Sequence, residues 1–201
     1  MPSLRAFIAI ELDGASLRAL GAVQQRLKKT PGAQHVKWVA PESMHLTLKF
    51  IGDLDSGRVA QVQDAMRHAC DGSAPFELIL QGLGAFPNLN RPNVIWAGVS
   101  GQVASAARIA RRLEDECVGL GIERETRPFS PHLTLGRVKR EVGPGELAQV
   151  GDSIRRSAAG VGVGEIGRFG VRAVYLMRSD LKPTGAVYSS LGQVPLVEPT
   201  A

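Results

Sequence analysis

The spacing of apolar residues along the chain predicts short strands alternating with amphipathic helices. Strands are indicated where apolar and polar residues alternate, and helices where apolar residues recur every three or four positions, as at Leu20, Val23 and Leu27. In the first half, this pattern predicts a strand at residues 4–11, a helix at 14–29, strands at 36–39 and 45–51, a helix capped by Ser56 with an apolar stripe that ends at Cys70, and a strand at 76–86. The order is β-α-β-β-α-β, a split β-α-β unit.

The second half of the chain repeats this order of elements. The same pattern predicts a strand at residues 93–99, a helix at 101–120, strands at 122–126 and 132–139, a helix at 145–158, and strands at 169–177 and 187–194. Proline and serine lie in the turn before the third strand of each half, at residues 41–43 and 128–131. The chain is therefore predicted to contain one supersecondary unit twice.

Identities between the two halves support this duplication. Residues 41–48 and 128–135 share Pro, Ser, His, Leu, Thr and Leu, which are six of eight positions at a separation of 87 residues, and the first strands, counted from Arg5 and Asn93, lie at a separation of 88. We expect an α+β fold of two β-α-β-β-α-β lobes related by a pseudo-twofold axis, each an antiparallel sheet with helices on its outer face. Residues 1–201 would form a single bilobal domain, with repeat halves at about 1–88 and 89–201 and the active site in the cleft between the lobes.

The repeated tetrapeptides His45-Leu46-Thr47-Leu48 and His132-Leu133-Thr134-Leu135 form the candidate site. Side chains alternate along a strand, so the histidine and threonine of each copy share one face while both leucines point into the lobe. Twofold symmetry then brings two imidazoles and two hydroxyls to one place. A single copy is more typical of a structural histidine, but a matched pair favours a site, because histidine is a poor choice for a repeated core position.

Two imidazoles and two hydroxyls suit the opening of a cyclic phosphate ester. A base must take a proton from water and an acid must protonate the departing ribose oxygen, and histidine, with a reference pKa of about 6.5, can do either. Threonine hydroxyls can donate hydrogen bonds to the non-bridging oxygens as charge builds up on them. Because a five-membered cyclic phosphate is already strained, we expect a reaction that needs no metal and no other cofactor.

Composition and charge narrow the class of protein. Apolar residues make up 44% and charged residues 21% of the chain, no apolar run approaches a membrane span, and no export signal is seen at the N-terminus, so a cytoplasmic protein without membrane contact is expected. The net charge of +5 weakly favours an anionic partner such as RNA, whereas the low aromatic content of 5% argues against a platform that stacks many bases. Cys70 and Cys117 are expected to be buried free thiols.

Several further segments make the chain resemble the 2H phosphoesterases, and among them the RNA 2′,3′-cyclic phosphodiesterases once called 2′-5′ RNA ligases. Besides the two motifs, the similarity covers residues 5–11, 36–42, 83–87, 93–98, 127–132 and 176–179, and so nearly the whole chain. The resemblance implies that His45 is the proton donor to the leaving O3′, that His132 is the proton acceptor that activates water, and that Thr47 and Thr134 bind the phosphate. It also implies RNA ends or oligonucleotides with a 2′,3′-cyclic phosphate as partners and a terminal 2′-phosphate as product.

Two basic residues are further candidates for binding the substrate. The family often has a basic residue at the position of Arg137, although strict alternation from His132 would point Arg137 away from the cleft. Lys49 lies four residues after His45, on the same strand face by alternation, and is an alternative phosphate contact. We expect the protein to act as a monomer, with ligation of 2′-5′ RNA ends as a side activity.

Other interpretations of the sequence remain open. The same site could act on a small cyclic nucleotide or on ADP-ribose cyclic phosphate, or the chain could be a nucleotide-binding module, although such a module would not need two acid–base groups. The run from Gly162 to Gly167 matches G-x-G-x-x-G, but a helix is predicted before it and a strand after it, the reverse of a dinucleotide site. Asp53 and Asp55 are expected to cap or solvate the turn at Ser56 rather than to bind a metal.

Overall fold

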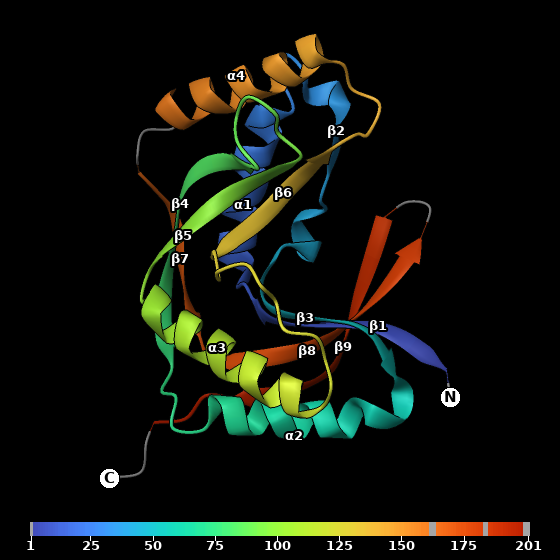
Figure 1. Ribbon diagram of the computed structural model, residues 1–201. Helices are drawn as coiled ribbons and strands as arrows, with labels where there is room; N and C mark the ends of the chain where they lie inside the picture. Colours follow the sequence, from blue (N-terminus) through green and yellow to red (C-terminus); the bar gives the residue numbers. More distant parts are fainter. Residues whose placement is uncertain (1, 161–163, 183–184, 199–201) are drawn as a thin grey trace.

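The structure is a computed structural model that describes residues 2–160, 164–182 and 185–198 (Figure 1). These residues form one curled antiparallel sheet and four α-helices. The elements in chain order are β1 (Ser3–Glu11), α1 (Gly14–Leu27), β2 (Val36–Trp38), β3 (His45–Asp55), α2 (Val59–Cys70), β4 (Phe76–Phe86), β5 (Val94–Gly101), α3 (Val103–Gly119), β6 (His132–Val138), α4 (Pro144–Gly160), β7 (Glu165–Val171), β8 (Ala173–Lys182) and β9 (Gly185–Pro195). The expected α+β class is confirmed.

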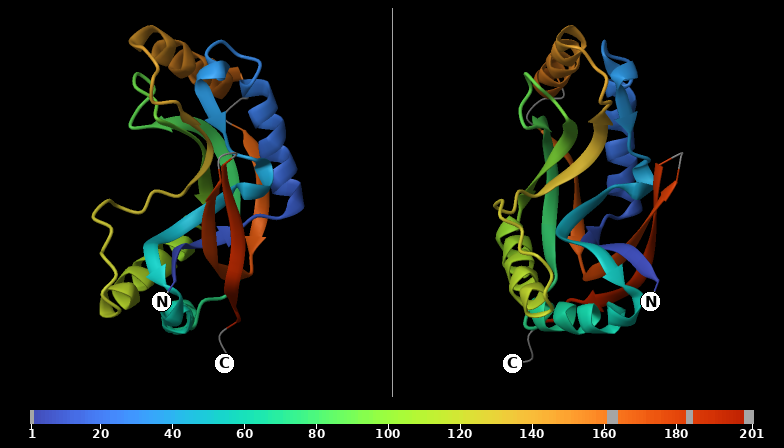
Figure 2. Two further views of the ribbon diagram at one scale, coloured as in Figure 1. Left: turned by 90° about the vertical axis from the view of Figure 1, so that its right-hand side faces the viewer. Right: turned by 45° about the vertical axis from the view of Figure 1, so that its right-hand side comes forward.

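The sheet has two parts, each with its own pair of helices. Its strand order is β7-β4-β5-β6-β3-β1-β8-β9, and β2 pairs with β6. Helices α2 and α3 pack against each other and against β3, β8 and β9, whereas α1 and α4 pack against β7 and β4 (Figures 1 and 2). We call the first group, with β1, the β1 lobe and the second group, with β2, β5 and β6, the β6 lobe.

The two lobes do not coincide with the two halves of the sequence. Helix α1 follows β1 directly in the chain but packs with β7 and α4 in the other lobe. Strand β8, from the second half of the sequence, pairs with β1 from the first half, and β9 pairs with β8. Each lobe is therefore built from segments of both halves, and the chain crosses between the lobes several times.

Strand register gives the position of the pseudo-twofold axis. Ala9 pairs with Thr47 in the β1 lobe, and Trp96 pairs with Thr134 in the β6 lobe. Trp96 is 87 residues after Ala9, and Thr134 is 87 residues after Thr47, so the two pairs are equivalent in the repeat. The two lobes are joined by one pairing between β3 and β6, that of Leu46 with Leu133, and these two residues are also 87 apart. The axis therefore passes through this pairing, which lies between the two histidine motifs.

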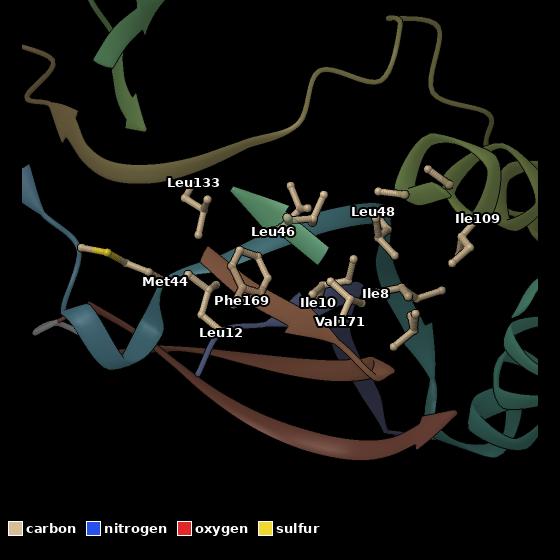
Figure 3. Close-up of a cluster of buried hydrophobic side chains, with 14 of the residues drawn as sticks. Ile8, Ile10, Leu12, Met44, Leu46, Leu48, Ile109, Leu133, Phe169 and Val171 are labelled. Atoms are coloured by element: carbon tan, nitrogen blue, oxygen red, sulfur yellow. The ribbon is translucent and has the colours of Figure 1, made fainter. Parts of the chain in front are cut away.

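The leucines of the two motifs are part of the hydrophobic core. Leu46, Leu48, Leu133 and Leu135 are each at most 5% exposed and belong to the main buried cluster. Figure 3 shows Leu46 and Leu133 in this cluster, close to strands β1 and β7. Burial of four leucine side chains fixes both strands, since each stabilises the fold by about 1.5–3 kcal/mol.

Two of the expected strands are different in the structure. Residues 122–126 form no strand but belong to an exposed connection between α3 and β6. The strand expected at residues 169–177 is two strands, β7 and β8, separated at Arg172, because β7 pairs with β4 in the β6 lobe and β8 pairs with β1 in the β1 lobe. Gly162 of the glycine-rich run lies outside the described residues, and β7 already begins at Glu165.

The start of α2 and the two cysteines can be compared with the expectations from the sequence. The expected cap at Ser56 is wrong: Ser56 lies in a short 3₁₀ turn capped by the Asp55 carboxylate, which accepts a hydrogen bond from the Gly57 amide, and α2 begins only at Val59, with Arg58 before it. Cys70 and Cys117 are free, buried thiols, and burial raises the pKa of each to about 11. Neither thiol is therefore a reactive thiolate near neutral pH.

Candidate active site

The four motif side chains lie on one face of the sheet, on either side of the pseudo-twofold axis. His45 and Thr47 in β3, and His132 and Thr134 in β6, are all partly buried, while the leucines between them are fully buried on the opposite face. The alternation expected from the sequence therefore holds over the motifs themselves.

Each imidazole is held by a backbone carbonyl two residues before it. The Nδ1 atom of His45 lies 2.9 Å from the Ser43 oxygen, and Nδ1 of His132 lies 2.7 Å from the Ser130 oxygen. A carbonyl oxygen can only accept, so Nδ1 carries the proton in both rings. Both Nε2 atoms are therefore left for chemistry, either as a base or, once protonated, as an acid.

The register of the joining pair sets each histidine against the threonine of the other motif. Because Leu46 pairs with Leu133 in antiparallel fashion, His45 faces Thr134 and Thr47 faces His132. In a regular ladder, such opposite residues have Cβ atoms about 4.5–5.5 Å apart. One imidazole and one hydroxyl thus flank each side of the joining pair.

Aromatic side chains pack around both histidines. The Phe7 ring is stacked on His45 with centroids 4.6 Å apart, and Tyr188 meets the edge of His45 at 5.0 Å. Phe86 meets His132 at 4.8 Å. Burial lowers the pKa of both histidines, and in each the backbone hydrogen bond partly offsets the effect. For His132, the nearby Arg137 charge lowers the pKa further.

A β-bulge in β6 turns Arg137 toward the histidine face. The pairing of β5 with β6 shifts at Leu135, so Leu135 and Gly136 are both buried and Arg137 is exposed. The buried Gln24 of α1 supports the bulge, since its Nε2 donates to the Leu135 oxygen at 3.0 Å and to the Val39 oxygen at 2.5 Å. The bulge therefore interrupts the strict alternation of side chains and places Arg137 on the same face as His132, as a role in the site requires.

The matching bulge in β3 has the opposite effect on Lys49. The pairing of β1 with β3 shifts at Leu48, and Lys49 is 2% exposed on the core side. Its Nζ donates to the Glu114 carboxylate at 2.8 Å and to the Glu123 oxygen at 2.6 Å. The expected phosphate contact through Lys49 is therefore wrong, because one extra residue in the strand reverses the face on which Lys49 lies.

Sequence reasoning missed three residues on the histidine face. Phe50 pairs with Phe7, is 60% exposed, and stands 87 residues before Arg137, so the repeat itself could have indicated it. Tyr188 comes from β9, far along the chain, and no local signal marks it. Lys37 is opposite Arg137 in the pairing of β2 with β6. This neighbour could be identified only once the strand pairing was known.

The described residues include no group of three or more His, Cys, Asp or Glu side chains arranged to hold a metal ion. Asp53 is paired with Arg5 in the β1–β3 ladder, and Asp55 is engaged in its cap, so neither belongs to the site. Within the described part of the chain, no helix has the length and apolar character needed to cross a membrane.

Comparison with known proteins places the chain in a family. Residues 10–96 and 98–185 each match the family described as LigT-like phosphoesterases. A Methanothermobacter thermautotrophicus protein named RNA 2′,3′-cyclic phosphodiesterase is 34% identical over 94% of this chain and 96% of its own length, and an Archaeoglobus fulgidus protein of the same name is 33% identical over 94% and 98%. Among solved structures, TT0787 of Thermus thermophilus has a TM-score of 0.77 and 26% identity, covering 98% of this chain and all of its own. Escherichia coli LigT complexed with 3′-AMP has a TM-score of 0.73 at 22% identity, a likeness in fold. The chain belongs to the LigT-like phosphoesterases of the 2H superfamily and is an enzyme.

Proposed function

We propose that the protein hydrolyses the 2′,3′-cyclic phosphate at an RNA end to a 2′-phosphate by paired-histidine acid–base catalysis. The observation that carries the proposal is the duplicated site, in which two imidazoles, each held through Nδ1 with Nε2 left for chemistry, face the threonine of the other motif. The relatives named RNA 2′,3′-cyclic phosphodiesterase, which match almost the full length of the chain, support the choice of substrate. The two free thiols fit the further proposal that it works in the reducing cytoplasm, and we propose that it does so as a monomer.

In the proposed mechanism, the two histidines act on opposite sides of the phosphorus. Nε2 of His132 takes a proton from water as its oxygen bonds to phosphorus, and the bond from phosphorus to O3′ breaks. Nε2–H of His45 gives its proton to O3′, which leaves a 3′-hydroxyl and a 2′-phosphate. Thr47 and Thr134 donate hydrogen bonds to the non-bridging oxygens, and solvent exchange then restores both imidazoles.

An asymmetry between the repeats supports this assignment of roles. The Arg137 cation lowers the pKa of His132, which favours the neutral imidazole that a base requires. At the equivalent place beside His45 stands Phe50, which is uncharged, so no cation there adds to the effect of burial on the pKa of His45. If a 5′-hydroxyl replaces water as the nucleophile, the same site would form a 2′-5′ linkage, which we regard as a side activity.

The proposed roles predict how the reaction depends on pH. A base must start neutral and an acid protonated, so kcat/KM should trace a bell against pH. Burial lowers the pKa of both histidines in the free protein, so both limbs of the kcat/KM profile should lie below about pH 6.5. A bound phosphate anion favours the protonated form of His45 and raises its pKa, so the falling limb of kcat should lie at higher pH than that of kcat/KM.

Initial rates between about pH 4.5 and 9 measure both profiles. A rate that rises through pH 9 without a falling limb would show that no protonated imidazole is needed. Falling limbs at the same pH in kcat and kcat/KM would contradict the assignment of His45 to the group that gains a proton beside the phosphate.

Two facing cations favour a polynucleotide over a small cyclic nucleotide. Lys37 and Arg137 are directly opposite in the β2–β6 pairing, both are exposed, and neither has a carboxylate within 4.0 Å among the described residues. Like charges at opposite positions repel each other unless an anion lies between them. Arg137 is close enough to His132 to affect its pKa, so we assign Lys37 to a phosphate further along the RNA backbone.

Replacing Lys37 with glutamine should therefore act on long substrates alone. We expect a lower kcat/KM for an oligonucleotide, and a shallower dependence of log kcat/KM on log salt concentration, by about 0.7 for one lost contact to a single strand. The rate for a 2′,3′-cyclic mononucleotide, which has no second phosphate, should not change. Lys139→Gln, at an exposed lysine bonded to the Gln34 oxygen, serves as the control. An equal loss of kcat/KM for the oligonucleotide and the mononucleotide would show that Lys37 does not bind a second phosphate of the RNA.

The direct test of the proposed function is to identify the product. Incubation with an oligonucleotide that ends in 2′,3′-cyclic phosphate should give a terminal 2′-phosphate, which resists a phosphatase specific for 3′-phosphates. We expect full activity in excess chelator, because acid, base and hydrogen-bond donors are all protein groups. A 3′-phosphate product would show that the substrate binds in the opposite orientation, with His45 beside O2′. If neither the oligonucleotide nor the mononucleotide were turned over, the proposed function would be refuted.

A further inference from the structure

The connection between α3 and β6, residues 120–131, delivers the second motif to the site. It ends immediately before His132 and contains Ser130, whose carbonyl oxygen holds Nδ1 of His132. Figures 1 and 2 show it as a long irregular segment that leaves α3 and runs to the start of β6. Most of its residues are exposed, and Leu120, Ile122 and Phe129 are partly buried against the main core cluster.

A buried ion pair of the β1 lobe binds the backbone of this connection. Nζ of Lys49 donates to the Glu114 carboxylate at 2.8 Å and to the Glu123 carbonyl oxygen at 2.6 Å. The same Glu114 carboxylate oxygen accepts the Glu125 amide at 3.1 Å. The side chains of Lys49 and Glu114 are 1% and 16% exposed, so the pair is well shielded from water. Two backbone groups of the connection are thus held from β3 and α3.

The chain between this anchor and His132 has little conformational freedom. The Glu125 carboxylate accepts both the amide and the Nε of Arg127, at 3.1 and 3.0 Å. Pro128 and Pro131 fix their own backbone φ and restrict the residue before each of them. Phe129 packs against the main core cluster. A shift at residues 123–125 would therefore be carried along the connection toward Ser130 and His132.

We propose that Lys49 and Glu114 are positioning residues for His132. Lys49 directly follows the first motif in β3, so the pair ties the strand of one catalytic histidine to the connection that places the other. This inference rests on the proposed function for its catalytic consequence, since a base must be held in place to act on water at the phosphorus. The two motifs, which share one pairing between β3 and β6, are thereby held together at a second place.

The test uses the double variant Lys49→Met with Glu114→Leu. A buried ion pair can often be replaced by apolar residues of similar volume without loss of stability. Glu123 and Glu125 are exposed residues, so we expect water to replace the hydrogen bonds that their backbone groups lose. We expect a native melting temperature, faster amide hydrogen exchange confined to residues 120–131, and a kcat lower by about 10–10²-fold with KM little changed. Lys49→Met alone leaves the Glu114 carboxylate unpaired and serves as the less stable comparison.

Asp115→Asn is the matched control, because Asp115 lies beside Glu114 in α3 and pairs with Arg124 of the same connection, but at the surface. This variant should leave both exchange and kcat close to those of the wild type. The proposal is overturned if the double variant keeps wild-type kcat, if kcat falls without faster exchange in the connection, or if exchange increases over the whole fold. Should the wild-type protein not open the cyclic phosphate, the proposed function fails, while exchange still decides whether the pair anchors the connection.

Discussion

Replacing His132 with alanine is expected to lower kcat by about 10²–10⁴-fold, and His45→Ala by a similar factor, because each variant removes one of the two proton transfers. Both imidazoles have Nδ1 bound to a backbone carbonyl, and Nε2 has no hydrogen-bond partner among the described residues, so each ring has one nitrogen for the reaction. The measurement is steady-state turnover of an oligonucleotide with a 2′,3′-cyclic phosphate end. The double variant should be little slower than the slower single one, because groups that act as a unit are not additive.

Both histidine variants should remain folded, since the motif leucines, not the histidines, are in the main core cluster. Circular dichroism and melting temperature check this. His68→Ala is the matched control: His68 is exposed in α2 and lies 3.5 Å from Glu116, and its loss should leave kcat unchanged. Near-normal turnover by either variant would remove that histidine from the mechanism. A loss as large in the control would indicate an effect of folding rather than of chemistry.

The sequence predicts the duplicated motifs and the fold class well because both depend on local pattern. Alternation puts the motif histidines and threonines on one face and the leucines on the other, and the structure has this arrangement. The strand expected at residues 76–86 has the same bounds in the structure, Phe76–Phe86, since it is long and clearly alternating. Strand and helix patterns of this kind need no knowledge of distant contacts.

The bulges could not be predicted from alternation, and they reverse the faces of two candidate residues. Alternation put Lys49 on the histidine face and Arg137 on the core face, and the structure has each on the other side. The bulge in β6 depends on Gln24, which comes from a helix more than a hundred residues earlier, and on Gly136. A Cβ at Gly136 would lie 2.6 Å from the Val36 side chain, so glycine is required there by the packing of β2.

The division into lobes was also outside the reach of the local pattern. The repeat in the sequence suggests that each half forms its own lobe. In the structure, however, α1 from the first half packs with β7, and β8 from the second half pairs with β1. Residues 169–177 were expected as one strand because the apolar pattern continues through Arg172, where the chain passes from one lobe to the other. A repeat of 87 residues identifies equivalent positions and does not decide with which partners they pack.

Thr47→Val and Thr134→Val should each lower kcat by about 10²–10³-fold, the range for removing one donor to a charged transition-state oxygen. Valine keeps the shape of threonine and removes the hydroxyl, so folding should be preserved at these partly buried positions. Threonine to serine at the same positions keeps the hydroxyl and should recover most of the rate. Steady-state kcat for the four variants, with melting temperatures, makes the comparison. If valine and serine lowered kcat equally, the methyl group rather than the hydroxyl would matter.

A cyclic phosphorothioate separates the two threonines. Because Thr47 faces His132 and Thr134 faces His45 across the joining pair, the two hydroxyls approach the phosphorus from different sides and should bind different non-bridging oxygens. Sulfur is a weaker hydrogen-bond acceptor than oxygen, so each diastereomer weakens the contact of one threonine. Thr47→Val should therefore lose sensitivity to sulfur in one diastereomer, and Thr134→Val in the other. If both variants lost sensitivity to the same diastereomer, the two hydroxyls would share one oxygen, and the twofold arrangement of the donors around the phosphate would be wrong.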